Sequence, residues 1–75
     1  MDLEKKFALT IHRLRLSSDE KLTQQDIADE AGISLRYYCS LEKGIKNPTL
    51  KVIDAIAVAY GMKSWELLRL MDSID

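Results

Sequence analysis

Hydrophobic positions recur along the chain with the three- and four-residue spacing of helices, and the alternation typical of strands is nearly absent. An apolar stripe near the N-terminus predicts a first helix over residues 2–16, with Leu3, Phe7, Ile11 and Leu14 on one face. A second stripe predicts a helix from about Thr49 to Gly61, with Leu50, Ile53, Ile56, Ala57 and Tyr60 on one face. The residues that we expect in the core are Leu3, Phe7, Ile11, Leu14, Ile27, Leu41, Val52, Ile53 and Ile56.

Polar residues and a glycine between these stripes predict a further helix over residues 24–31. Thr23 is a typical N-cap residue, and Asp26 three positions later can complete a weak form of the capping box. Gly32 can adopt the left-handed conformation that ends many helices, because it carries no Cβ.

The next connection, residues 32–34, is only three residues long. Ser34 can cap a helix that ends near Gly44, and two helices joined this closely cannot lie antiparallel. They must cross at a steep angle, which is the geometry of a helix-turn-helix. With a fifth helix expected over residues 65–71, the chain is predicted to be an all-α, compact five-helix bundle. It would form one domain over residues 1–75, with the helix-turn-helix at about 23–44.

Composition excludes several classes of protein. The 75 residues are 47% hydrophobic and 31% charged, as in a globular domain rather than a disordered chain. One cysteine cannot form an internal disulfide, and no apolar run reaches the roughly 18 residues of a membrane span. We therefore expect a cytoplasmic protein. The sequence has one histidine, one cysteine and no phosphate-binding glycine loop. We therefore expect no enzyme active site, metal site or cofactor.

Charge is distributed unevenly, although the net charge is only −1. Residues 36–51 contain four basic side chains and one acidic side chain, Glu42. Residues 19–30 contain five acidic side chains and one basic side chain, Lys21. This polarity favours a nucleic-acid partner near residues 36–51 more than the total charge suggests.

Three sequence blocks, residues 22–34, 40–44 and 46–50, resemble the phage repressor and Cro-like helix-turn-helix family, often called the XRE family. The pattern continues through Gly61 to Leu68 and covers nearly the whole chain. The resemblance implies a lambda-repressor-like domain that binds palindromic operator DNA as a homodimer and controls transcription. The small size also resembles restriction-modification controllers and prophage regulators.

The same resemblance assigns roles to individual residues. Gln24 matches a family glutamine that holds a DNA phosphate at the start of the second helix. Arg36 is the candidate for a bidentate contact to guanine in the major groove. Glu42 matches an acid that pairs with an arginine of the first helix, here Arg15. The other positions that match DNA-contacting residues are Leu35, Tyr37, Ser40, Lys43, Lys46 and Asn47. Tyr38 departs from the pattern, and a buried tyrosine needs a partner for its hydroxyl.

The last helix carries more apolar residues than one face can bury. We expect a dimer interface there, formed by Trp65, Leu67, Leu70, Met71 and Ile74. The alternative is that Trp65 and Leu68 complete the core while the tail frays. A second functional hypothesis is an antitoxin-like protein-interaction module, and a contact with RNA polymerase or another protein also stays open.

Overall fold

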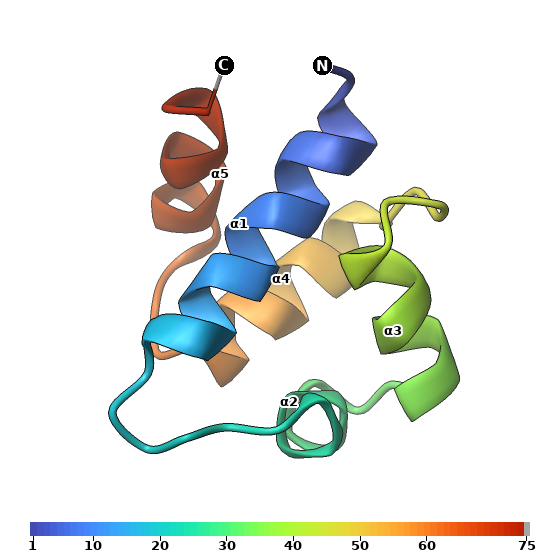
Figure 1. Ribbon diagram of the computed structural model, residues 1–75, viewed down its shortest axis with the longest axis vertical. Coiled ribbons are helices and arrows are strands. Elements are labelled where there is room, and N and C mark those ends of the chain that lie inside the picture. The colour runs from blue at the N-terminus through green and yellow to red at the C-terminus, as the bar shows by residue number, and fades with distance from the viewer. Residues whose placement is uncertain (75) are drawn as a thin grey trace.

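The computed structural model describes residues 1–74 and contains five helices in that range. They are α1 (Leu3–Ser17), α2 (Gln24–Ala31), α3 (Leu35–Glu42), α4 (Leu50–Ala59) and α5 (Ser64–Asp72). The all-α prediction is confirmed, and Asp75, the last residue of the predicted domain, lies outside the described residues. The start of α1 and the end of α5 lie on the same side of the bundle (Figure 1).

Side-chain caps fix where the helices begin, as the sequence predicted for α2 and α3. The Thr23 hydroxyl accepts a hydrogen bond from the Asp26 backbone N–H at 3.0 Å, and the Asp26 carboxylate accepts one from the Thr23 N–H at 2.9 Å. The Ser34 hydroxyl accepts a bond from the Tyr37 N–H at 3.1 Å. These bonds satisfy backbone donors that a helix start leaves unpaired, so the starts of α2 and α3 are both defined locally.

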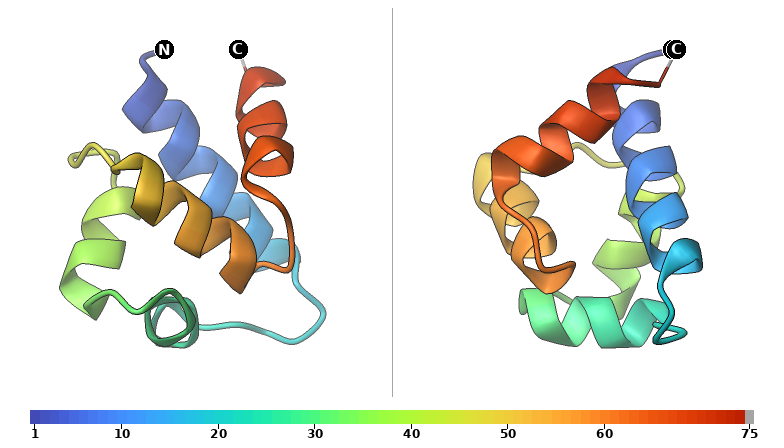
Figure 2. Two further views of the ribbon diagram at one scale, coloured as in Figure 1. Left: turned by 180° about the vertical axis from the view of Figure 1, so that it is seen from behind. Right: turned by 90° about the vertical axis from the view of Figure 1, so that its left-hand side faces the viewer.

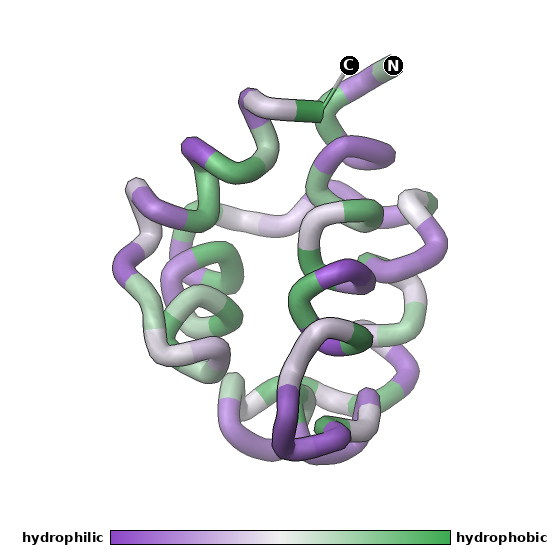
Figure 3. Tube along the Cα trace, turned by 60° about the vertical axis from the view of Figure 1, so that its left-hand side comes forward, coloured by the Kyte–Doolittle hydropathy of each residue, from purple (hydrophilic) through white to green (hydrophobic). Residues whose placement is uncertain are grey.

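The helices enclose one hydrophobic core. Helix α2 packs against α3 and α4, α1 packs against α3 and α5, and α5 also contacts α4. Figure 2 shows the helices from two further sides, with α2 closing one end of the bundle. Hydrophobic and hydrophilic residues alternate around the helices rather than gathering in one segment (Figure 3). The residues that form the centre of this core are Phe7, Ile11, Ile27, Ala28, Tyr38, Leu41, Ile56, Ala57, Leu67 and Met71.

One predicted core residue lies outside the core. Leu3 is 67% exposed, because it occupies the first turn of α1 at the open end of the bundle. Val52 and Ile53 are half-buried and pack against the edge of the core. The helical period therefore identified the inward face of α1 correctly but not how far along α1 the neighbouring helices reach.

The buried Tyr38 hydroxyl has the partner that its burial requires. Its oxygen lies 2.8 Å from the Tyr60 hydroxyl, which itself donates to the Ile11 carbonyl oxygen at 3.1 Å. Since the Tyr60 proton is used on Ile11, Tyr38 is the donor in the pair. Burial raises the pKa of Tyr38 and raises that of Tyr60 to about 12. The chain of hydroxyls ties α3 to the end of α4 and to the middle of α1.

Candidate nucleic-acid interface

The turn between α2 and α3 orients α3 across α2. Gly32 adopts φ 71°, a left-handed conformation that favours glycine, and the Ile33 N–H donates to the Ala28 carbonyl at 3.0 Å. In Figure 1, α2 is seen end-on while α3 is seen from the side, so the two helices cross steeply. Ala28 is fully buried and leaves room for this close crossing.

The outer side of α3 presents the residue types that the sequence assigned to DNA contact. Arg36 and Lys43 are exposed, and Leu35 is 39% exposed. Tyr37 and Ser40 are half-buried, and the Ser40 hydroxyl donates to the Arg36 carbonyl of its own helix at 3.0 Å. The Ser40 oxygen therefore retains acceptor capacity, while the Arg36 guanidinium makes no salt bridge among residues 1–74. This face combines a cation, an aromatic ring and an apolar group.

The loop after α3 adds further exposed polar groups. Lys46 and Asn47 are both exposed. Gly44 begins this loop with φ 75°, and a Cβ on it would lie 3.4 Å from the Lys5 side chain and 3.6 Å from Ala8. A Cβ there would make only ordinary contacts with α1, so glycine is favoured by the left-handed backbone of the turn that leads to Lys46 and Asn47.

Arg15 and Glu42 form a two-point ion pair between α1 and the end of α3, the pair expected from the sequence. Arg15 Nε lies 2.8 Å from Glu42 Oε2, and Arg15 Nη2 lies 3.0 Å from Oε1. His12 Nδ1 lies 3.0 Å from the same Oε1; because a carboxylate only accepts, this nitrogen carries the proton. This structural role of His12 was not predicted from the sequence, although His12 lies three residues before Arg15 on α1.

Glu42 is thereby held in its charged form. Its side chain is only 5% exposed, and burial alone would raise its pKa. The opposing hydrogen bonds, above all that from Arg15, lower the pKa of Glu42 to about 2. The same bond raises the pKa of Arg15. The ion pair therefore persists throughout the neutral pH range.

Burial of Glu42 also changes the electrostatics of the outer surface. Glu42 is the single acidic residue between Arg36 and Lys51, and its charge is neutralised inside the protein by Arg15. The solvent-facing charges of that segment are therefore all positive, and they belong to Arg36, Lys43, Lys46 and Lys51. A surface of this kind attracts phosphate.

Comparison with known proteins agrees with this geometry. A family profile described as helix-turn-helix matches residues 11–68. The chain belongs to the XRE-type helix-turn-helix family. This family and the relatives below are transcriptional regulators rather than enzymes.

Two relatives and one solved structure show how this helix-turn-helix protein compares with others. It is 35% identical over 68 residues to an uncharacterised HTH-type transcriptional regulator, y4dJ, of Sinorhizobium fredii, covering 91% of this chain and 86% of the relative. It is 32% identical over 62 residues to the cryptic phage CTXphi transcriptional repressor RstR of Vibrio cholerae, covering 83% of this chain and 54% of RstR. The fold is similar to that of the restriction-modification controller protein C.Esp1396I, with a TM-score of 0.82, 21% identity, and coverage of 96% of this chain and 90% of that one.

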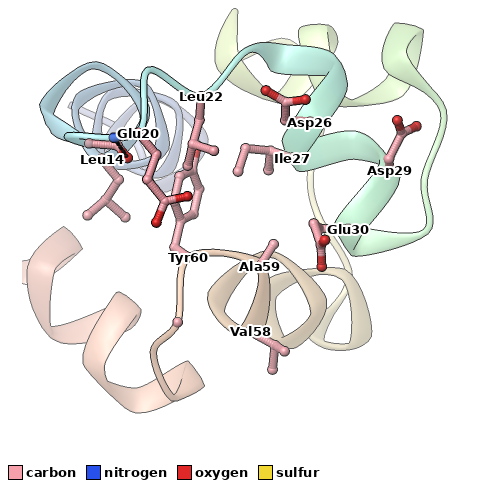
Figure 4. Close-up of a pocket in the computed structure, with 12 residues that line it drawn as sticks. Leu14, Glu20, Leu22, Asp26, Ile27, Asp29, Glu30, Val58, Ala59 and Tyr60 are labelled. Carbon is pink, nitrogen blue, oxygen red and sulfur yellow. Dashed lines mark hydrogen bonds between the residues drawn. The ribbon is translucent and has the colours of Figure 1, made fainter.

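The helix-turn-helix protein also has an acidic groove that draws no residue from α3. Its volume is about 820 Å³, and it lies between α2, the end of α4 and the loop before α2. Figure 4 shows the carboxylates of Glu20, Asp26, Asp29 and Glu30 around apolar side chains that include Leu22. Acidic and basic surfaces of the helix-turn-helix protein are thus carried by different elements.

The residues that the sequence assigned to a dimer interface are partly buried in the core and partly exposed on α5. Leu67 is fully buried, and Met71 and Ile74 are 7% and 8% exposed, so these three belong to the core of the single chain. Leu67 and Met71 face inward because α5 packs against both α1 and α4, and Ile74 follows the end of α5. Trp65 and Leu70 are 57% and 39% exposed. The apolar area of α5 left for a partner is therefore smaller than expected. The alternative in which Trp65 and Leu68 complete the core does not hold, because Leu68 is 42% exposed.

Residues 1–74 hold neither a cluster of metal ligands nor a membrane-spanning helix, as the placed side chains and the helix lengths show. No group of three or more histidine, cysteine, aspartate or glutamate side chains there is placed to hold a metal ion. Among the described helices, none combines the length and apolar character needed to cross a membrane.

Proposed function

We propose that this protein is a sequence-specific regulator that binds double-stranded DNA in the cytoplasm as a homodimer on a palindromic operator. The observation that carries the proposal is the outer face of α3, where all solvent-facing charges are positive because Glu42 is buried against Arg15. Family membership supports DNA binding and transcriptional control. Two copies related by a two-fold axis would present two such faces to half-sites about one helical turn apart.

The proposed contacts divide into those that position the protein and those that read sequence. Arg36 would donate to a guanine edge in the major groove, and Leu35 would meet a thymine methyl. Gln24 at the N-terminus of α2 would bind a phosphate, where the helix dipole also favours negative charge. The remaining proposed contacts are made by Tyr37, Ser40, Lys43, Lys46 and Asn47.

The proposed dimer interface uses the exposed part of α5. Trp65 and Leu70 line a shallow hollow together with Met62, Glu66 and Arg69. An apolar surface of this kind is covered in many assemblies, and a two-fold axis there would pair each hollow with its copy. Leu70→Glu would place a charge in the interface and should give monomers at micromolar concentration. An intact Leu70→Glu dimer by analytical ultracentrifugation would move the interface elsewhere.

Selection from a random double-stranded DNA library at about 150 mM salt tests the proposal directly. Enrichment of an inverted repeat is expected. The folded protein should then lose affinity as salt rises, with a slope of log K against log salt of about −0.9 per phosphate contacted. Failure of the folded protein to enrich any sequence would refute the proposal.

Arg36→Ala separates base recognition from simple charge attraction. Loss of the guanine contact should relax preference at one position of each half-site by about 1–3 kcal/mol. Arg13→Ala is the matched control, since it removes an equal charge from an exposed position on α1. Unchanged base preference in Arg36→Ala would show that α3 is not placed in the groove as proposed.

The alternative of an antitoxin-like interaction module is favoured by one observation, the exposed apolar pair Trp65 and Leu70 on α5. A partner protein covering that pair would bind with little dependence on salt, whereas DNA binding weakens steeply as salt rises. Titration of salt in any binding assay thus discriminates the two functions.

A further inference from the structure

The side-chain amide of Gln24 is held at both of its ends. Its Nε2 donates to Glu42 Oε1 at 3.2 Å, and its Oε1 accepts from the Cys39 thiol, with Sγ at 3.3 Å. Gln24 lies at the first position of α2, whereas Cys39 and Glu42 both belong to α3. These two bonds join the start of α2 to the middle and the end of α3.

The chemistry of the two partners sets which end of the amide faces which side chain. The Glu42 carboxylate can only accept, so the NH₂ end must face it, and the carbonyl end then faces Cys39. A thiol can donate to that carbonyl, and it is the donor supplied by this position of α3. One of the two Nε2 hydrogens is used on Glu42, so one hydrogen is left for a further acceptor.

The geometry points to Cys39 as a positioning residue for DNA binding, acting through Gln24. The thiol holds the Gln24 carbonyl and Glu42 holds one N–H, so that the second N–H is oriented before any phosphate arrives. The inference deepens the proposed function, in which Gln24 binds a phosphate, and it depends on that function for its effect on affinity. Preorganised donors bind more tightly because less conformational freedom is lost on binding.

The role assigned to Cys39 differs from that of its neighbours on α3. Cys39 is half-buried and its thiol contacts Gln24 of α2, whereas Arg36 and Lys43 are exposed. Neither the thiol nor the amide carries a charge. Loss of their bond should therefore change affinity without changing the salt dependence, unlike loss of a lysine that contacts phosphate.

A double-mutant cycle on the enriched DNA site tests the inference. Cys39→Ala should weaken binding about three- to tenfold, the loss expected for one hydrogen bond, with an unchanged salt slope. Cys39→Ser keeps a donor at the same position and should restore most of the affinity. In a Gln24→Ala background, Cys39→Ala should have no further effect, because the group that it orients is gone. An equal loss in both backgrounds, or no loss in either, would overturn the inference.

A second measurement on the free protein separates failure of this inference from failure of the proposed function. In ¹⁵N-labelled protein, the Gln24 side-chain amide should give a well-dispersed pair of signals with high order. Cys39→Ala should lower that order and narrow the dispersion, whereas Cys39→Ser should not. A mobile Gln24 amide in the unaltered protein would overturn the inference even if the protein binds DNA. An ordered amide in a protein that does not bind DNA would instead refute the proposed function.

Discussion

Replacement of Glu42 by glutamine tests how much the buried Glu42 carboxylate contributes to the free energy of unfolding. The carboxylate accepts four hydrogen bonds, two from Arg15 and one each from His12 and Gln24. Glutamine has nearly the same shape but carries no charge and can present only one oxygen as an acceptor. Arg15, whose side chain is 15% exposed, would then lose its counter-charge. Breaking such a pair by changing one partner is strongly destabilising, because it leaves the other charge uncompensated.

The magnitude follows from the pKa of Glu42, which falls from an ordinary value of 4.5 to about 2 in the folded protein. A lowered folded-state pKa means that the charged form stabilises the fold. A difference of that size corresponds to about 3 kcal/mol at neutral pH, as an upper bound. A domain of this length has a total stability of only about 4–11 kcal/mol, so Glu42→Gln should lower it substantially.

The pH dependence gives the sharper result. The Glu42 contribution is fully present above the unfolded pKa of 4.5 and is lost as pH falls through that value toward about 2. Urea unfolding followed by circular dichroism, repeated from pH 7 down to pH of about 2.5, should show a difference between the two proteins that shrinks as the medium becomes acidic.

The control for this series is Glu30→Gln, which removes an acid from an exposed position on α2. Its stability profile should follow that of the unaltered protein at every pH. A constant gap between Glu42→Gln and the unaltered protein across the acidic range would refute the reasoning, since it would show that the lost stability does not come from the carboxylate charge.

Three further substitutions test the packing. Tyr60→Phe removes the hydroxyl that links α3 to the Ile11 carbonyl and should cost about 1–3 kcal/mol, measured by urea unfolding. Gly44→Ala forces a Cβ onto a residue with φ 75° near α1 and should cost more than about 1 kcal/mol in the same assay. Leu67→Ala should cost about 2–5 kcal/mol because the side chain is fully buried, whereas Trp65→Ala should change the stability of the monomer by only about 0.5 kcal/mol. Equal losses for Leu67→Ala and Trp65→Ala would contradict the division of α5 into buried and exposed residues.

The sequence predicted the local structure well because its signals are local. Thr23, Asp26 and Ser34 act within three or four residues of themselves, so the bounds of α2 and the start of α3 could be predicted from spacing alone. The helix-turn-helix follows from the same signals together with Gly32.

Contacts between distant elements were harder to predict. The sequence showed that Tyr38 would need a partner but not that Tyr60, 22 residues later, would supply it. On α5, the number of apolar residues indicated a surplus, but which of them face outward depends on how α1 and α4 pack against that helix. Leu67 was for that reason assigned to an interface although it lies in the core.

The sequence predicted which residues form the candidate site but not the hydrogen bonds between them. Sequence pattern and resemblance supplied Arg36, Lys43 and Lys46, which are exposed as a contact surface requires. The bond between Cys39 and Gln24 joins two helices across 15 residues of sequence, and no spacing rule indicates it.

The separation of the acidic groove from α3 has a consequence for how the protein moves near DNA. Negative groups beside α2 and α4, and positive groups on α3 and its following loop, give the molecule an electric dipole although its net charge is only −1. In the electric field of a DNA duplex, such a dipole turns the basic side of the protein toward the DNA before contact. The protein then samples fewer orientations before it binds. Under the proposed function, the carboxylates of the groove would repel phosphate, so the groove side of the protein would not hold DNA.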